Sequence, residues 1–553
     1  MKKITYTLLL SALTSSFVWA QDLAQVEYDI EFEKYDTAKE SLYKLMRKEP
    51  KPFEGNYYYN IGVVHIEQGF PDSAMIYLKQ GLLAPKDTDI INIAVGRIAL
   101  DEGKDKEANS KFNASLYNAK SGDIKFLLLI AKNYIESDNP DTAQAIEYAR
   151  RALEIQPNSI DARIMLADAF FAEKSIRNAW ATLLEIKRLD ENNVPMLHSM
   201  AKIHKYNNEF PQAIEKLELA ISENPNFEPA YKLLGEVYAD FARFSGDKTK
   251  RKDAVENYAK YHEMIGKSYD SDNDYLQFLV RNFQFEELQE LTDKVWLERG
   301  RNFPLYKFRG IAEFELGNRD EAFRHLWQYF DVQDKSKLKG VDLLYYGLSE
   351  IEKSKNLDGT YNDEQYNKAI DNIAQGVSKD AELAEELYQY GLELFNEEKY
   401  MQAYFLFDIG TRNPNNRNLV YDSYYKGTTL YLLSDDPMFK NQTQKAIEAF
   451  NLAIEASPTS HESYLQKART LALMSGNTVE AEAEKAYQKF IDIIEDKDLM
   501  HIEPLRDGVI EAATYVGSYN AEKDSAKAKR YFQKVLNLQP NNHAVKERLN
   551  SLN

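Results

Sequence analysis

The sequence predicts an all-α protein in which antiparallel pairs of helices stack into a solenoid. Residues 160–193 and 194–227 form two adjoining blocks of 34 residues, and side chains of similar size recur at matching positions of the two blocks. A fixed period of this length is typical of solenoids, because each repeat buries its apolar face against the next one. No segment of the 553 residues shows the sustained alternation of apolar and polar residues that predicts a β-strand.

The two blocks match at six positions. The aligned pairs are Leu166 with Met200, Ala167 with Ala201, Phe170 with His204, Ala179 with Ala213, Leu183 with Leu217, and Ile186 with Ala220. Pro225 follows at position 32 of the second block, where its missing N–H ends a helix. This pattern resembles the tetratricopeptide repeat (TPR), a helix–turn–helix unit of 34 residues. The resemblance implies a TPR-type α-solenoid, a right-handed superhelix of antiparallel helix pairs, with small residues at positions 8 and 20 where the two helices meet.

The same spacing continues through about fourteen repeats, some of them degenerate. We expect an N-terminal solenoid over 21–269, an irregular central segment over 270–382, and a C-terminal solenoid over 383–553. Residues 543–553 fit a polar capping helix, which solenoids need at their ends. Within the central segment, residues 271–302 lack the small-residue pattern, and we expect a short first helix there and a break between superhelical segments. Insertions at 241–253, 353–366 and 434–444 are predicted to be loops between helices.

Residues 1–20 have the pattern of a cleaved signal peptide. Lys2 and Lys3 precede an apolar run over 4–13, and Ala20 provides a small residue at the cleavage site. The run is too short to span a bilayer as a helix, although a retained N-terminal anchor is an alternative. We expect a mature chain that begins at Gln21, has no membrane span and lies in the periplasm of a Gram-negative bacterium. An outer-membrane-associated or secreted protein is the alternative, and peripheral association with an envelope complex fits either setting.

Composition excludes several classes of site and partner. The chain has no cysteine, which excludes disulfides, thiolate zinc sites and a lipid-modified cysteine. Its formal net charge of −19 argues against nucleic acid as a partner, because nucleic-acid binding requires a basic surface. No phosphate-binding glycine motif, nucleophile elbow or paired metal-ligand histidines occur, and His65 and His204 fall at a packing position. We therefore predict no enzyme activity, no cofactor, no metal and no catalytic residue.

The TPR resemblance implies a concave groove lined by the first helix of each repeat, with positions 2, 5, 9 and 12 facing a bound peptide or helix. In the first half these positions hold mostly cations, namely Arg97, Lys132, His198, Lys202, Lys205 and Lys232, with Asp168 and Glu236 as exceptions. In the second half they hold mostly aromatic residues: Lys307, Phe314, Tyr388, Phe395, Tyr424, Thr428 and Tyr431. The alternative is that the lysines are scattered and the aromatic residues are internal packing. The family's carboxylate clamp for chaperone tails is not complete, so that ligand is not expected.

Four Asp-Ser/Thr-Ala tripeptides stand at the starts of predicted second helices. Their hydroxyl residues are Thr37, Ser73, Thr142 and Ser525. The aspartates are suited to cap the helices, because a carboxylate accepts hydrogen bonds from free N–H groups at a helix start. The same tripeptide resembles an O-glycosylation sequon of periplasmic proteins, so modification of these hydroxyls is the alternative. The basic stretch 248–252 fits a solvated turn or, alternatively, a contact with an acidic partner or a lipid headgroup.

These observations favour a periplasmic scaffold or adaptor that binds a protein or peptide partner in its concave groove. Envelope biogenesis, protein export and outer-membrane assembly are the expected settings. The alternative is a structural component of a secretion or gliding-motility machine that is bound through its convex face and inserted loops. A ligand carrier or enzyme is a third reading. The oligomeric state is not predicted by the sequence.

Overall fold

The computed structural model describes residues 23–48, 53–117, 122–247, 249–266, 268–300, 304–356, 358, 360–434, 442–476 and 479–552. The predicted signal peptide, 1–20, lies outside these residues. Contacts within the chain divide it into two units, Met1–Glu298 and Arg299–Asn553, which are described separately. The division into 21–269, 270–382 and 383–553 stays a prediction, and the observed boundary falls inside the expected central segment.

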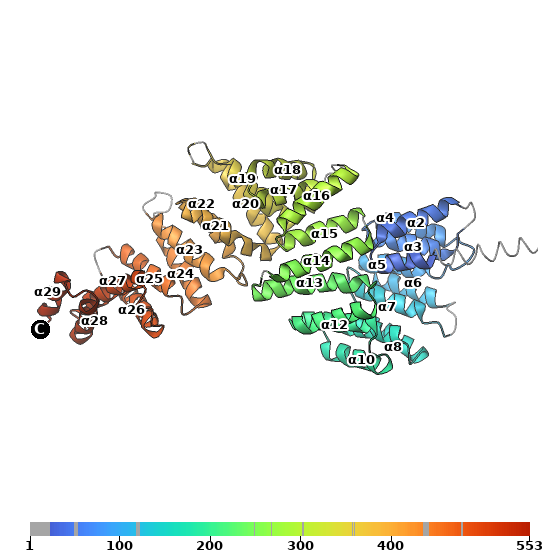
Figure 1. Cartoon of the computed structure of the whole chain (residues 1–553), viewed down its shortest axis with the longest axis horizontal. Coiled ribbons are helices and arrows are strands. Elements are labelled where there is room, and N and C mark those ends of the chain that lie inside the picture. Colours follow the sequence, from blue (N-terminus) through green and yellow to red (C-terminus); the bar gives the residue numbers. More distant parts are fainter. Residues whose placement is uncertain are drawn as a thin grey trace, which may run out of the picture. The chain divides into compact units, whose positions relative to one another are not determined.

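The described residues of the N-terminal unit form eight helix pairs (Figure 1). After a helical segment at residues 23–31, its helices are α2 (Tyr35–Lys48), α3 (Gly55–Glu67), α4 (Pro71–Gly81), α5 (Ile91–Asp101), α6 (Asp105–Tyr117), α7 (Lys125–Glu136), α8 (Thr142–Ile155), α9 (Ile160–Ala172), α10 (Ile176–Leu189), α11 (Val194–Tyr206), α12 (Phe210–Glu223), α13 (Glu228–Ser245), α14 (Thr249–Ile265), α15 (Tyr269–Arg281) and α16 (Phe285–Arg299).

The C-terminal unit adds six pairs and a last helix. Its helices are α17 (Leu305–Glu315), α18 (Arg319–Val332), α19 (Gly340–Lys353), α20 (Asp363–Lys379), α21 (Leu387–Asn396), α22 (Tyr400–Gly410), α23 (Leu419–Leu432), α24 (Thr443–Ala456), α25 (His461–Met474), α26 (Ala481–Asp496), α27 (Glu503–Asn520), α28 (Ser525–Leu538) and α29 (His543–Ser551), with short 3₁₀ turns η1 (Lys335–Lys337) and η2 (Ala381–Glu386). The described residues contain no strand, only an isolated bridge between Lys355 and Tyr361. The all-α fold, the repeat number and the C-terminal capping helix are confirmed.

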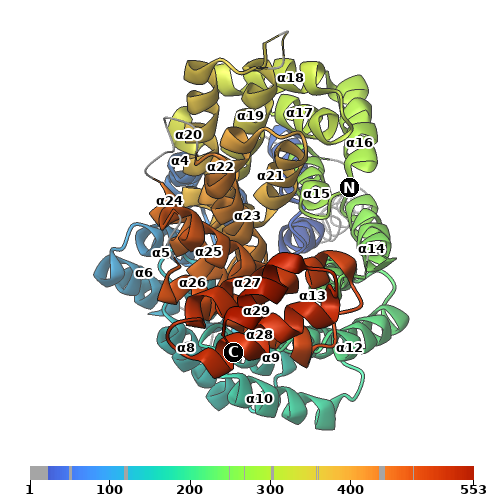
Figure 2. The same ribbon diagram turned by 90° about the vertical axis from the view of Figure 1, so that its left-hand side faces the viewer.

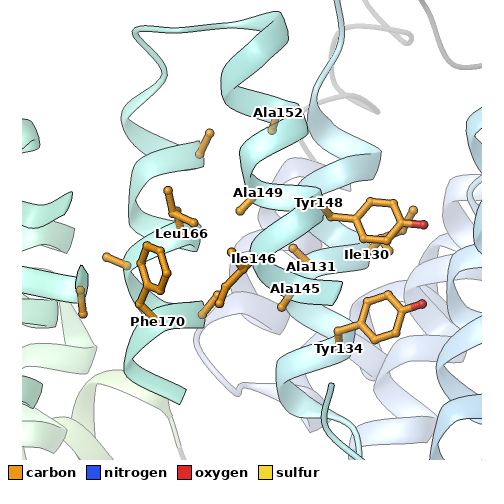
Figure 3. Close-up of a cluster of buried hydrophobic side chains, with 14 of the residues drawn as sticks. Ile130, Ala131, Tyr134, Ala145, Ile146, Tyr148, Ala149, Ala152, Leu166 and Phe170 are labelled. Carbon is orange, nitrogen blue, oxygen red and sulfur yellow. The ribbon is translucent and has the colours of Figure 1, made fainter. Parts of the chain in front are cut away.

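The core of the N-terminal unit follows the repeat pattern read from the sequence. Figure 3 shows Leu166 and Phe170 of α9 on one side of α8, and Tyr134 of α7 on the other. Small residues of α8, such as Ala145 and Ala149, are fully buried between them. All twelve aligned residues of the two central blocks are buried except His204, which is half-buried. Close approach at the small positions therefore builds the stack, as the spacing predicts.

Two local predictions for the N-terminal unit are wrong. Residues 241–253 are not a loop, because α13 continues to Ser245 and α14 already begins at Thr249. The added residues lengthen both helices because Phe241 packs on Phe210, with ring centroids 5.4 Å apart, and Ala242 is buried. The first helix of the irregular repeat, α15, is also not short, since it has 13 residues.

The structure describes the other two predicted insertions, 353–366 and 434–444, to different extents. Between α19, which ends at Lys353, and α20, which begins at Asp363, the described residues form no helix, so the loop predicted at 353–366 is confirmed for them. Within it, the Asp358 carboxylate accepts a hydrogen bond from the Thr360 hydroxyl at 2.6 Å. Most of the insertion at 434–444 lies outside the described residues.

The capping prediction is confirmed at two of the four tripeptides. Asp141 accepts a hydrogen bond from the Gln144 N–H at 3.0 Å, and Asp524 accepts one from the Lys527 N–H at 2.9 Å. At Asp36 and Asp72 it is wrong, because α2 and α4 begin one residue earlier and place these aspartates inside the first turn. There a carboxylate still favours the positive end of the helix, but it does not accept the capping bond.

Candidate interaction surface

The predicted groove cations of the N-terminal unit lie on first helices, and two of them, Lys202 and Lys205, pair with acids one repeat away. The Lys202 Nζ is 2.7 Å from the Asp168 Oδ1, and the Lys205 Nζ is 2.8 Å from the Glu236 Oε2. These partners are 34 and 31 residues apart, so the ion pairs link neighbouring first helices across the stack. The two sequence exceptions, Asp168 and Glu236, are thus the counter-ions of the lysines.

Arg97 on α5 is the most buried of these cations. Its guanidinium Nε is 3.0 Å from the Asp101 Oδ1, and its Nη2 donates to the backbone carbonyl of Glu136 at 2.7 Å. The Glu67 carboxylate lies 3.5 Å from Nη1, one repeat in the other direction. A planar group that joins three neighbouring first helices in this way fixes their spacing.

A longer-range set of contacts joins the first repeat to the fourth and seventh repeats. Three acids of residues 23–34 meet three lysines about 100 to 200 residues further along the chain. The pairs are Glu27 with Lys125 at 3.3 Å, Glu31 with Lys132 at 3.1 Å, and Glu33 with Lys232. In Figures 1 and 2 the green helices α13–α15 lie beside the blue N-terminal helices, in agreement with these contacts. This closure is not predicted from the sequence, because it brings together residues 98 to 199 positions apart in the chain.

Glu228 at the start of α13 is the buried centre of the closure. Its carboxylate accepts hydrogen bonds from the Tyr28 hydroxyl at 3.0 and 3.1 Å and from the Lys34 Nζ at 2.9 Å. Burial and the neighbouring Glu228 raise the pKa of Tyr28 to about 12, so the phenol remains a donor. Beside this group, the ring of Phe32 meets that of Phe227 edge to face, with centroids 6.1 Å apart. The contact therefore combines a buried ionic hydrogen-bond group with an aromatic pair.

Electrostatics differ between Lys132 and His198, which the sequence analysis had grouped together. Burial alone would lower the pKa of Lys132, but the carboxylates of Glu136 and Glu31 outweigh it and raise the pKa. For His198, burial and then the nearby Lys202 lower the pKa to about 3. The imidazole is therefore neutral at neutral pH, and it packs edge to face on Phe227 with centroids 5.7 Å apart. His198 adds an aromatic face to this surface and no charge.

In the C-terminal unit the predicted aromatic positions pack largely on other aromatic residues of the helices. Tyr388 of α21 lies 5.6 Å from Tyr421 between ring centroids, and Phe395 lies 4.9 Å from Tyr425. Tyr421 keeps 55% of its surface exposed, so this cluster reaches solvent.

The remaining predicted positions of this unit differ in exposure. Tyr424 and Tyr431 are half-buried, whereas Phe314 and Thr428 are buried. Lys307 is also buried and forms an ion pair with Asp342 at 3.3 Å. These three buried side chains are part of the packing between helices.

The last repeats enclose a hollow of about 650 Å³ that the sequence analysis did not identify. Tyr487, Glu511, Tyr515 and Arg548 are among the residues that line it. The Glu511 carboxylate accepts hydrogen bonds from the Tyr487 hydroxyl at 2.8 Å and from the Arg469 Nη2 at 2.6 Å, so it is already satisfied.

The hydroxyls considered for glycosylation differ in access. Thr37 and Ser525 are exposed, whereas Ser73 and Thr142 are half-buried, and modification of all four stays a prediction. In the described part of the chain, no group of three or more His, Asp and Glu side chains is arranged to hold a metal ion. Over the same residues, none of the helices has both the length and the apolar character needed to cross a bilayer.

Comparison with known proteins identifies the repeat. A tetratricopeptide repeat family model matches residues 518–542, which contain α28. The Photosystem I assembly protein Ycf3 of Rippkaea orientalis is 30% identical over 132 residues, covering 22% of this chain and 72% of that protein. The chain belongs to the tetratricopeptide repeat family. Proteins of this family bind protein partners and generally act as non-enzymatic scaffolds.

Other relatives cover different shares of the chain. The Ycf3 protein of Cyanophora paradoxa is 30% identical over 113 residues, which are 19% of this chain and 63% of that protein. The C-terminal part of a TPR protein from Cytophaga hutchinsonii has 23% identity and a TM-score of 0.35, covering 50% of this chain and 98% of that one. A TPR protein from Parabacteroides merdae has 14% identity and a TM-score of 0.33, covering 46% of this chain and 93% of that one.

Proposed function

We propose that this TPR protein is an interaction scaffold of the bacterial periplasm. We further propose that the inner face of its N-terminal unit, formed by first helices such as α7, α11 and α13, binds a polypeptide segment of a partner. One observation carries the proposal. Lysines of α7 and α13, and the ring of Phe227 just before α13, already contact residues 23–34 of the same chain. A surface that holds one acidic segment through ion pairs and ring contacts has the chemistry to hold another.

The cellular setting is proposed from the sequence. Residues 1–20 carry the charge and apolar pattern of a signal peptide, and the absence of cysteine is compatible with an oxidising compartment. The curated relatives are named as assembly proteins, which supports an assembly role as a class of function. Envelope biogenesis, protein export and outer-membrane assembly are the settings we propose for it.

Site-specific photo-cross-linking tests the interaction. A photoreactive amino acid at Lys202, on the inner face, should give a defined adduct in cells, whereas the same group at the exposed Lys187 of α10 should not. Identical adducts from both positions, or none from either, would contradict binding at the inner face. Where a simple substitution of Lys202 is needed, Lys202→Gln is preferred to Lys202→Glu, because a glutamate would place a second carboxylate beside Asp168.

Export is tested independently of binding. Fractionation should recover the protein with the periplasm, and N-terminal sequencing should begin at Gln21. Recovery of an uncleaved chain in the cytoplasm would contradict the location and leave the interaction proposal standing.

A further inference from the structure

Residues 23–34 combine carboxylates and aromatic rings in a regular pattern. Glu27 and Glu31 are four residues apart, as are Tyr28 and Phe32, so each pair lies on one side of the helical segment. Glu27 and Glu31 meet Lys125 and Lys132 of α7. The ring of Phe32 meets Phe227 just before α13, and the Tyr28 hydroxyl donates to Glu228 at the start of α13. The segment therefore presents an acidic stripe beside an aromatic stripe to one surface, which is formed by α7 and the start of α13.

This surface of α7 and the start of α13 is complementary to the pattern of the segment in charge and in shape. Lys125, Lys132 and Lys232 supply three ammonium groups, each within ion-pair distance of one acid. The Phe227 ring receives Phe32 and also meets the neutral His198 edge to face. A chain with a formal net charge of −19 thus gathers three lysines from two separate repeats onto one acidic segment.

The attachment of the segment is local and exchangeable. Val26, with Leu42, Ile61 and Val64, belongs to a small core that is separate from the main core of the N-terminal unit. The three ion pairs to α7 and α13 are partly exposed, with 41% to 65% of the acidic side chains accessible, so salt screens them. Among the ion pairs of the segment with α7 and α13, the one between Lys34 and Glu228 is buried. Segments with few buried contacts near a chain end open at low cost.

We propose that the inner face of α7 and α13 is a docking surface for an acidic helix of a partner protein that bears aromatic residues, and that residues 23–34 occupy it as an intramolecular stand-in. The partner helix carries two carboxylates four residues apart and an aromatic residue after each of them, which is the pattern of the segment it replaces. This inference rests on the proposed function and adds the class of partner. In the free protein, residues 23–34 cover this surface. A partner helix that binds replaces their ion pairs with its own, so the protein selects partners whose carboxylates and aromatic residues match the pattern of the segment.

The test uses the full-length protein and a synthetic peptide of residues 23–34 as the probe. In the charge-reversal variant Glu27→Lys/Glu31→Lys/Glu33→Lys, the segment repels the three lysines while Val26 keeps its place in the small core. This variant should bind the labelled peptide at least ~10-fold more tightly than the wild type does, by fluorescence anisotropy. The matched control Glu40→Lys/Glu107→Lys/Glu154→Lys changes the net charge equally at exposed positions and should behave as the wild type.

A second peptide and a second variant keep the outcome decisive. A peptide with glutamine in place of its three glutamates should lose at least ~10-fold in affinity. Val26→Asp, which expels the segment from its small core, should also take up the acidic peptide. The inference is overturned if neither opened variant binds the peptide while helix content is retained, or if both peptides bind equally. A wild-type dimer that the charge reversal abolishes would also overturn it, since the occupant would then be a second copy.

The result separates from the proposed function. If cells still give an adduct at Lys202 while no opened variant binds the peptide, the acidic-helix assignment fails and the scaffold proposal stands. If the peptide binds and no adduct forms at Lys202, this surface is competent but the proposed function fails.

Discussion

Asp422 is a buried carboxylate in the packing of α23. Its side chain is fully buried, and the Asn416 Nδ2 donates to its Oδ2 at 2.7 Å, whereas no described residue donates to its Oδ1. Burial raises the pKa of Asp422 to about 7. The folded chain therefore holds a proton that the unfolded chain releases above pH ~4. This group favours folding below that pH, and its contribution is lost as the pH rises to about 7.

Asp422→Asn should remove this pH dependence. The amide keeps the shape and carries no charge, so the variant should be more stable than the wild type at pH ~8 by about 1–3 kcal/mol. The difference should shrink as the pH is lowered toward ~5. Urea unfolding of both proteins over this pH range measures it, and a difference that stays constant with pH would contradict the assignment.

Asp408 on the neighbouring helix α22 is the matched control. Burial would raise the pKa of its carboxyl, but Lys426 and Arg412 outweigh burial and lower it. A lowered pKa stabilises the fold above the unfolded value, and this contribution is lost as the pH falls through the folded pKa. Asp408→Asn should therefore destabilise the protein at pH ~8, opposite in sign to Asp422→Asn.

At the scale of the helix pair, close approach requires glycine opposite phenylalanine. A Cβ added to Gly427 of α23 would lie 2.6 Å from the Phe450 Cε1 of α24, and the same clash recurs between Gly517 and Phe532. Two repeats have alanine at this position with leucine opposite it, namely Ala167 with Leu183 and Ala201 with Leu217. The two positions are therefore coupled in size.

Gly427→Ala should destabilise the C-terminal unit by about 1–3 kcal/mol, because the added methyl group overpacks the helix contact. Phe450→Leu in the same chain should restore part of this loss, since it recreates the alanine–leucine pair of other repeats. A double-mutant cycle by chemical denaturation measures the coupling. Glu448→Ala, at an exposed site of α24, is the control and should change stability by less than ~0.5 kcal/mol. Additive effects at the two core positions would contradict the size coupling.

Contacts within a repeat could be predicted from the sequence because they follow from spacing. Leu183 and Leu217 fall at one repeat position, and both are fully buried as expected. The connection at 241–253 could not be predicted in this way. Its lysine-rich and glycine-containing sequence favours a turn locally, whereas Phe241 finds a packing partner only in the assembled stack. Helix ends respond to such tertiary contacts more than to local preference.

The candidate surface was only partly predictable for a related reason. Arg97, Lys132 and Lys232 could be assigned to first helices, but their partners depend on how the stack curves. The meeting of Glu31 with Lys132, about 100 residues apart, follows from the sum of many small rotations between repeats. No local pattern encodes that sum. The acidic partners within one repeat period, such as Asp168, are visible in the sequence, but there they stand as exceptions to the cationic pattern of the groove positions.

At the scale of the N-terminal unit, the buried contacts of Glu228 hold the closure. Glu228→Ala leaves the Lys34 ammonium without its buried partner, so opening of residues 23–31 should become easier by about 2 kcal/mol. Hydrogen–deuterium exchange of these amides should therefore be faster, while exchange of α9 stays the same. Glu236, like Glu228, lies on α13, but it pairs with Lys205 of α11, so Glu236→Ala should leave residues 23–31 protected. Equal effects of the two variants would show general loosening of α13.

Salt should open the unit without unfolding it, because most of the ionic contacts that close it are partly exposed. The chain has no cysteine, so the pair Glu27→Cys/Lys125→Cys gives a single reporter for a short bismaleimide cross-linker. Its cross-linking yield should fall at least ~2-fold between ~0.02 and ~1 M salt, since the Debye length shrinks from tens of ångströms to about 3 Å. The pair Arg163→Cys/Glu185→Cys lies within one repeat, where packing fixes the distance, so its yield should not change. If both yields are independent of salt, the contacts of Tyr28 and Lys34 with the buried Glu228 and of Phe32 with Phe227 hold the unit closed, and exchange with a partner would have to break them directly.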